Sequence, residues 1–155
     1  VGFAIKDVVL LYALFNIAFV IASLPVGKLG DMIGRRYIIL LGYLIYLIMS
    51  LGFIFATDKW QIIVLFILFG VFYSIDEGQS KAFIADLEPE RRATAIGVYN
   101  FCMGLLYFLA SVIAGALWVL NPSYSLLFAA VTTIIALILF ILLFQPLLKV
   151  QPLTK

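Results

Sequence analysis

The residues best suited to chemistry lie within one long apolar stretch of the chain. They are Asp76, Glu77, Gln79 and Lys81. Glu77 precedes Lys81 by four residues, which is the favourable order for an ion pair along one helix. Asp76 and Gln79 share a second helical stripe with Phe83. Carboxylates in apolar surroundings need a partner or a cavity, and they mark proton relays and ion pathways.

Two interpretations of this group stay open. In the structural one, Glu77 and Lys81 neutralise each other, and Asp76 bonds to a neighbouring helix. In the functional one, Asp76 or Glu77 lines a central path and takes a proton or binds a cationic substrate. Asn16 and Asn100 are weaker candidates, which we expect to hydrogen-bond across helices, with substrate contact as the less favoured alternative.

A second polar group follows the first apolar stretch, and we call it the glycine–arginine motif (residues 27–36). It reads Gly27-Lys28-Leu29-Gly30-Asp31-Met32-Ile33-Gly34-Arg35-Arg36. Its glycines permit close backbone approach and positive φ, so we expect a tight turn between two helices. Asp31 lies among cations and can accept from them or from a helix N-terminus. The simplest interpretation is a hydrophilic anchor at a membrane face.

The composition of the chain indicates that both groups belong to a membrane protein. Of the 155 residues, 66% are hydrophobic and 12% are charged, whereas soluble domains run near 45–50% and 25%. The mean hydropathy is +1.22. Five stretches are long enough for membrane-crossing helices, which take roughly 20 residues each. They cover residues 8–26, 37–56, 60–83, 93–120 and 124–148. The sequence therefore predicts an all-α, polytopic helix bundle in contact with lipid.

The breaks between these spans are short, at residues 27–36, 57–59, 86–92 and 121–123, so consecutive helices should be antiparallel. Basic residues gather on one side of the membrane. That side holds Lys28, Arg35, Arg36, Arg91, Arg92, Lys149 and Lys155, against Lys6 and Lys59 on the other. The positive-inside rule makes the first side cytoplasmic. We expect a multi-pass protein of the cytoplasmic (inner) membrane with a cytoplasmic C-terminus.

Several kinds of site find no support in the sequence. The chain has no histidine and one cysteine, Cys102, so neither a metal site nor an internal disulfide is predicted. No phosphate-binding loop or zinc spacing occurs, and the net charge of +2 is too small to suggest nucleic acid as a partner. We predict no cofactor and no enzymatic activity, because no convergent nucleophile and base are visible.

Three segments together resemble the major facilitator superfamily of transporters. The pattern Gly27-x-Leu29-x-Asp31-x-x-Gly34-Arg35-Arg36 is similar to the family's loop signature between the second and third helices of each half. The run from Asp76-Glu77-Gly78 through Asp86 to Pro89-Glu90-Arg91-Arg92-Ala93-Thr94-Ala95-Ile96-Gly97-Val98-Tyr99 looks like its fourth-to-fifth helix junction. The segment Ala110-Ser111-Val112-Ile113-Ala114-Gly115-Ala116-Leu117-Trp118 looks like the end of its eleventh helix.

The resemblance implies helices eight to twelve of a twelve-helix transporter, in the C-terminal half. The seventh helix and the N-terminal half would then be missing partners of this fragment. It also implies secondary transport of a small solute by alternating access, with a proton as a candidate coupling ion. The implied conformational latch comprises Gly27, Asp31, Gly34, Arg35, Arg36, Asp86 and Arg92. Within it, Asp86 should meet Arg35, or else cap the turn before Pro89. The rival interpretation is a non-transporting membrane scaffold or assembly subunit.

Overall fold

Five long helices make up the fold. The computed structural model describes residues 4–148, with the side chains of residues 4–143. Its helices are α1 (Ile5–Ile33), α2 (Arg35–Phe55), α3 (Lys59–Leu87), α4 (Arg92–Leu120) and α5 (Pro122–Leu148), and the described residues contain no strand. All five are long and apolar enough to cross a membrane, which confirms the predicted all-α class. The tail lysines Lys149 and Lys155 lie outside the described residues.

The helices run beyond the predicted spans, and the expected turn over residues 27–36 is wrong. Helix α1 continues to Ile33, and Gly34 alone separates it from α2. Polar residues do not by themselves end a helix, whereas Gly34, at φ 100°, adopts a backbone conformation that only glycine takes without strain. The last connection is equally short, because Pro122 suits the first position of a helix and leaves only Asn121 between α4 and α5.

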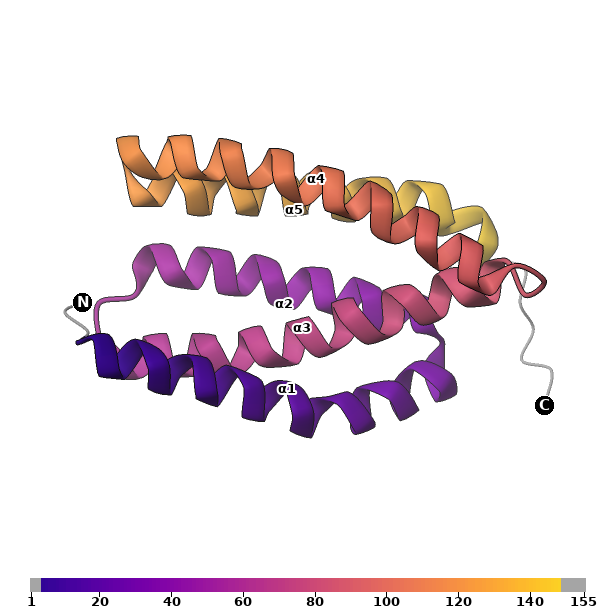
Figure 1. Ribbon diagram of the computed structural model, residues 1–155, viewed down its shortest axis with the longest axis horizontal. Coiled ribbons are helices and arrows are strands. Elements are labelled where there is room, and N and C mark those ends of the chain that lie inside the picture. The colour runs from indigo at the N-terminus through magenta and orange to yellow at the C-terminus, as the bar shows by residue number, and fades with distance from the viewer. Residues whose placement is uncertain (1–3, 149–155) are drawn as a thin grey trace.

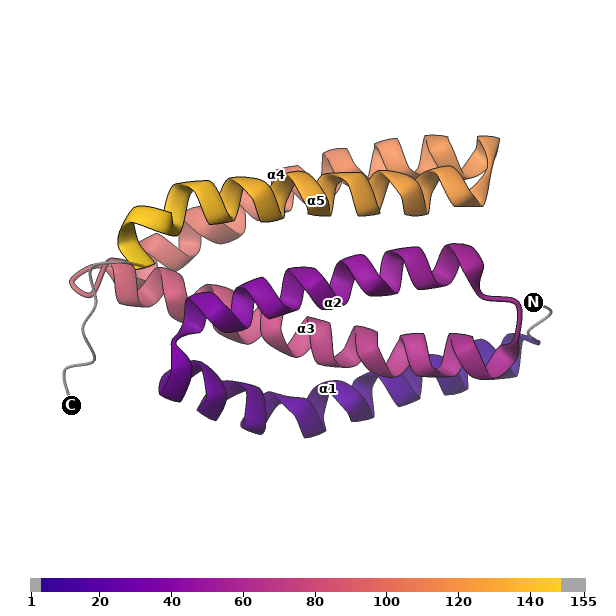
Figure 2. The same ribbon diagram turned by 180° about the vertical axis from the view of Figure 1, so that it is seen from behind.

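The bundle divides into a three-helix group and a two-helix pair. Figures 1 and 2 show α1, α2 and α3 packed together, with α4 and α5 side by side along the α2 side of this group. Helix α3 contacts α1, α2 and α4, and α2 contacts α5. Residues 88–91 connect α3 to α4, and the two helices move apart with distance from this connection (Figure 1). We call the end with Gly34 and residues 88–91 the motif end, and the end with residues 56–58 and Asn121 the far end.

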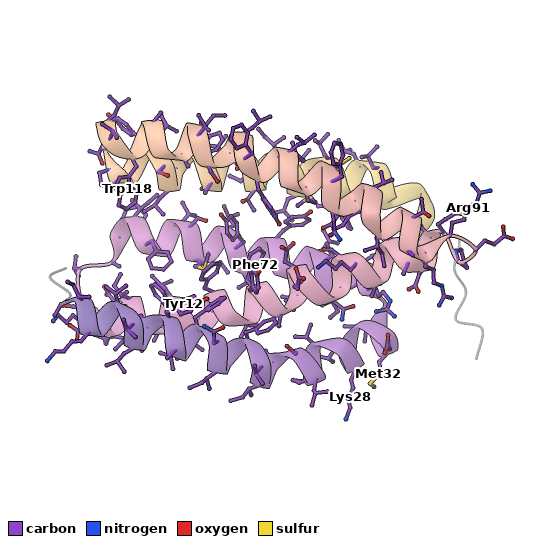
Figure 3. All side chains as sticks on the ribbon, viewed as in Figure 1. Tyr12, Lys28, Met32, Phe72, Arg91 and Trp118 are labelled. Atoms are coloured by element: carbon purple, nitrogen blue, oxygen red, sulfur yellow. The ribbon has the colours of Figure 1, made fainter. Side chains whose placement is uncertain are left out.

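Both tryptophans and one tyrosine lie at the far end. Trp60 and Tyr124 lie in the first turns of α3 and α5, and Trp118 lies in the last turn of α4. Figure 3 shows Trp118 and Arg91 at opposite ends of the bundle. Aromatic side chains of this kind are enriched where a helix meets the membrane–water interface.

Helix α4 differs from the others because none of its residues is buried. Its glycines Gly97, Gly104 and Gly115 have no other atoms within 4 Å of where a Cβ would stand. The Ser111-x-x-x-Gly115 spacing is typical of close helix contact in membranes, but no such contact is present at Gly115 among the described residues. By contrast, the three-helix group has a core of Ala22, Val26, Ile38 and Ile75.

Candidate functional site

The contact between α1 and α3 positions the polar residues of the site. At the middle of this contact a Cβ on Gly70 would stand 2.5 Å from the Phe15 carbonyl oxygen and 2.9 Å from the Phe19 amide nitrogen. The two backbones can approach this closely only because residue 70 is glycine. Rings of Phe15 and Tyr73 pack beside it, with centroids 5.5 Å apart. Helices α1 and α3 are therefore held in one register at this point of their contact.

Arg35 joins the glycine–arginine motif to α3. Its Nη2 lies 3.0 Å from Asp31 Oδ1, and its Nε donates to Asp86 Oδ2 at 2.6 Å. The Arg35–Asp86 contact implied by the resemblance is thus confirmed, and Asp86 pairs with the motif rather than only capping the turn before Pro89. Asp31 keeps a side chain that is 66% exposed, so this carboxylate remains accessible to a further partner.

The other motif residues lie around this ion pair. The Arg36 guanidinium carbon lies 5.7 Å from the ring centroid of Phe83 on α3, a cation–π distance. Gly27 has no atoms within 4 Å of where a Cβ would stand, so it makes no close approach of the kind expected. Lys28 points away from the bundle (Figure 3). Arg92 is exposed in the first turn of α4, and no contact among the described residues joins it to the glycine–arginine motif.

The two acidic residues of α3, Asp76 and Glu77, have different partners. Asp76 Oδ2 accepts a long hydrogen bond of 3.4 Å from the Tyr107 hydroxyl of α4. Glu77 pairs with Lys81 of its own helix. The contacts of the structural interpretation are thus confirmed. They do not decide against a functional role, because Glu77 remains exposed.

Gln79 reaches a third helix. It is 2% exposed, and its Nε2 donates to the Val26 carbonyl of α1 at 3.1 Å. The carboxamide occupies the space above Gly30, where a Cβ would stand 2.6 Å from its Cδ. Because Nε2 is committed to Val26, the amide orientation is fixed. Among the described side chains, Gln79 Oε1 is the buried polar atom that lacks a hydrogen-bond partner.

The predicted stripe of Asp76, Gln79 and Phe83 does not act as one face. Their side chains contact α4, α1 and an arginine of α2 respectively. Helix α3 has neighbours on three sides, so residues within a narrow arc of its surface reach different helices. The sequence stripe could not reveal this, because it shows the face of a helix but not its neighbours.

A groove between α1 and α3 joins the two polar groups. Its volume is about 240 Å³, and it is lined by Phe19, Ser23, Gly27, Asp31, Arg35, Ser74, Glu77, Gly78 and Gln79. The α1 members recur every four residues and so lie on one face of that helix. Both serine hydroxyls donate to backbone carbonyls of their own helices, Ser23 to Phe19 and Ser74 to Val71. Their oxygen lone pairs remain available as acceptors.

The two asparagines lie away from this groove. Asn16 Nδ2 donates to the Tyr12 carbonyl of its own helix at 2.7 Å, so the expected bond across helices is wrong for this residue. The carbonyl one turn back in the same helix takes the amide proton instead. Asn100 is exposed on α4, where it is not brought to the other candidates.

Sequence reasoning missed three features. Ser23 and Ser74 line the groove, and only their small polar side chains in apolar runs could have signalled this. Asp7 and Lys59 lie 4.0 Å apart at the far ends of α1 and α3. Because Asp7 and Lys59 lie far apart in the sequence, no spacing pattern indicates their contact.

Comparison with known proteins agrees with this architecture. A sequence model described as Major Facilitator Superfamily matches residues 1–154. The uncharacterized MFS-type transporter MJ1317 of Methanocaldococcus jannaschii is 42% identical over 134 residues, covering 84% of this chain and 34% of the relative. The uncharacterized MFS-type transporter YhjO of Bacillus subtilis is 32% identical over 92 residues, 59% of this chain and 23% of the relative. The chain thus spans about a third or less of these relatives. No solved structure matches.

Proposed function

Because this chain belongs to the major facilitator superfamily, we propose that it is part of a secondary transporter that moves a small solute across a membrane by alternating access. The family points to transport rather than to an enzyme. The observation that carries the proposal is the groove between α1 and α3, where Glu77 and Gln79 face the glycine–arginine motif. Polar groups that line a cavity within membrane helices are typical of a solute or ion path.

The same groove favours a transporter over a scaffold. A scaffold subunit should bury its intramembrane charges fully, whereas Glu77 has a side chain that is 46% exposed. Asp76 or Glu77 would take the proton or bind the cationic solute in this proposal. Since the chain holds no phosphate-binding loop, an ion gradient or the solute gradient would drive transport.

We assign the chain to helices eight to twelve, within the C-terminal half of a twelve-helix protein. The placement rests on the motif resemblance, and two observations support the view that the chain is part of a longer helical protein. The chain matches about a third of its relative's length, and α4 has no buried residue, as expected if a further helix or the other half packs against it. The glycine–arginine motif would then face the cytoplasm of a cell whose inner membrane holds the protein, with the C-terminus on the same side.

Asp31 is the residue we propose as the latch to the other half. Arg35 holds one carboxylate oxygen, and the exposed remainder of Asp31 can accept from a helix N-terminus of the opposite half. Such a contact would close the motif end and so stabilise the outward-facing state. Gly34 and the Arg35–Asp86 pair keep Asp31 in position, since they fix the end of α1 against α3.

Site-specific labelling tests the alternating-access mechanism. In the full-length protein, Cys102 is replaced by alanine and one cysteine is placed at Ser23, inside the groove. A membrane-impermeant maleimide is added from each side of proteoliposomes. We expect Asp31→Asn to raise the labelling rate from the motif end, because the outward-facing state is weakened. Glu88→Gln, an exposed change outside the groove, is the control. Equal labelling in both variants contradicts the latch.

Transport assays test the coupling role. A screen of radiolabelled solutes in proteoliposomes first identifies the substrate. Asp76→Asn and Glu77→Gln are then compared with the unmodified protein as pH is varied. If either residue carries the coupled proton, its variant loses the pH dependence of uptake. Unchanged pH-dependent uptake in both variants would remove both residues from the coupling role.

A further inference from the structure

We propose that Gln79 of α3 is the positioning residue for the end of α1 that carries Asp31, an inference that rests on the latch and the transporter proposed above. That end is the α1 arm (residues 26–33), which follows Pro25 within the helix. Proline has no N–H, so the helix lacks one backbone bond there, and helices bend at such points. Figure 1 shows α1 bowed along its length. The arm is therefore held less firmly by its own helix, and contacts with α3 decide where it lies.

Gln79 contacts both buried residues of the arm. Beyond Pro25, the buried residues of α1 are Val26 and Gly30. The Val26 carbonyl accepts a hydrogen bond of 3.1 Å from Gln79 Nε2. Gly30 lies under the same carboxamide, because a Cβ at this glycine would stand 2.6 Å from Gln79 Cδ. Residues 26 and 30 share one face of α1, so a single buried side chain of α3 spans the face by which the arm meets that helix.

The ion pair between Asp31 and Arg35 is a weaker tie for the arm. The Asp31 side chain is 66% exposed, and exposed ion pairs contribute little to stability. Arg35 also lies beyond Gly34, in α2, so it does not itself hold the arm on α3. Asp31 directly follows Gly30 in the chain. The position of its carboxylate therefore depends on how Gly30 is seated against Gln79.

The chemistry of Gln79 favours positioning over packing. Its Oε1 is buried without a hydrogen-bond partner among the described residues, and it packs against Gly30. An apolar side chain of the same shape avoids such an unmet acceptor, and so serves packing as well or better. What the amide adds is one directional bond, from Nε2 to the Val26 carbonyl. That bond fixes the rotation of the arm and its height along α3.

A distance between two spin labels tests the docking of the arm. In the full-length protein with Cys102→Ala, labelled cysteines replace Lys28 of the arm and Val64 of α3, which are both exposed. Val64 lies about 22 Å along α3 from Gln79, which suits double electron–electron resonance. Gln79→Met keeps the size of the side chain and removes the bond to the arm. We expect the loss of a single narrow distance, without a fall in melting temperature. An unchanged distance overturns the inference, and so does a broadened distance with a lower melting temperature, which would make Gln79 a packing residue.

Exchanging size between the two helices gives a result that misfolding cannot imitate. Gly30→Ala places a Cβ 2.7 Å from Gln79 Nε2, which displaces the carboxamide from the Val26 carbonyl and broadens the distance. In the Gln79→Ala background, the same Gly30→Ala change fills vacated space and should narrow the distance. Gly27→Ala is the matched control, because it adds a methyl to the same arm with no atom within 4 Å. If Gly30→Ala acts in the same direction in both backgrounds, the inference fails.

Labelling of a cysteine at Ser23 connects the arm to the latch. Gln79→Met should raise the labelling rate from the motif end, as Asp31→Asn does, because a displaced arm misplaces the Asp31 carboxylate. The double variant should react no faster than the faster single variant, since both changes act on one contact. Glu88→Gln remains the control. Effects that multiply in the double variant would show that Gln79 does not act through Asp31, and would overturn its positioning role.

The two measurements separate this inference from the transporter proposal. Two-sided labelling that responds to Asp31→Asn, with neither labelling nor distance responding to Gln79→Met, would refute the role of Gln79 and leave the transporter in place. A distance that broadens in Gln79→Met, with labelling from one side only in every variant, would do the reverse. Gln79 would then still hold the arm on α3, and alternating access would be wrong.

Discussion

Gly70→Ala is the sharpest test of how the site is positioned. A Cβ at this residue would lie 2.5 Å from the Phe15 carbonyl oxygen and 2.7 Å from the Ala18 Cβ. The nearer contact is about 0.9 Å short of the 3.4 Å at which ordinary van der Waals contact begins. Because the obstructing atoms belong largely to the α1 backbone, no side chain can move aside. The two helices must separate.

The cost follows from the clash and from helix propensity. Forcing an extra methyl into a packed contact costs about 1–3 kcal/mol, while glycine to alanine within a helix gains about 1 kcal/mol. Gly78→Ala is the matched control, because it lies on the same helix and has no atom within 4 Å of its Cβ position. Gly78→Ala therefore has the gain in helix propensity without the steric clash. The difference between the two variants therefore isolates the clash, at about 1–3 kcal/mol.

Unfolding of the full-length protein in mixed micelles, with rising denaturing detergent, measures this difference. We expect Gly78→Ala to be at least as stable as the unmodified protein, and Gly70→Ala to unfold at a lower detergent fraction than both. If Gly70→Ala matches or exceeds Gly78→Ala, the close approach of α1 and α3 is wrong, and the groove that depends on it is wrong too.

Three further predictions concern the motif end and the link to α4. Gly34→Ala should lower stability by about 1–3 kcal/mol, seen as a lower melting temperature, because φ of 100° strains any residue with a Cβ. A double-mutant cycle of Arg35→Gln and Asp86→Asn should give a coupling of about 0.2–1 kcal/mol, since the pair is partly exposed; additive effects would contradict the ion pair. Tyr107→Phe should free the Asp76 carboxylate and increase its reaction with a carbodiimide, measured by mass spectrometry; unchanged labelling would contradict the bond.

The sequence predicted the helices well and their ends less well. Apolar runs of 20 or more residues leave little choice but a helix in lipid. The ends were harder, because Lys28 and Asp31 look like loop residues, although α1 continues through both of them. Gly34, the residue that does end the helix, is one of three glycines in the motif. Only its backbone conformation distinguishes it from Gly27 and Gly30.

Contacts within one helix were also predictable, and contacts between helices mostly were not. The Glu77–Lys81 pair follows from a spacing of four. The Arg35–Asp86 pair, 51 residues apart, was expected only from the family resemblance. The bond from Gln79 to Val26 depends on which helix lies against that side of α3. No pattern along the chain specifies this, because every helix here is apolar on most faces.

The single-residue link at Gly34 couples the orientation of α1 closely to that of α2. A helix turns by about 100° per residue, so one inserted residue at the link would swing Arg35 roughly a quarter of the way around its axis and away from Asp86. Only the φ and ψ of Gly34 can absorb a rotation of α1 before it reaches α2. A twist of α1 larger than this one residue can absorb would therefore pull on the Arg35–Asp86 pair.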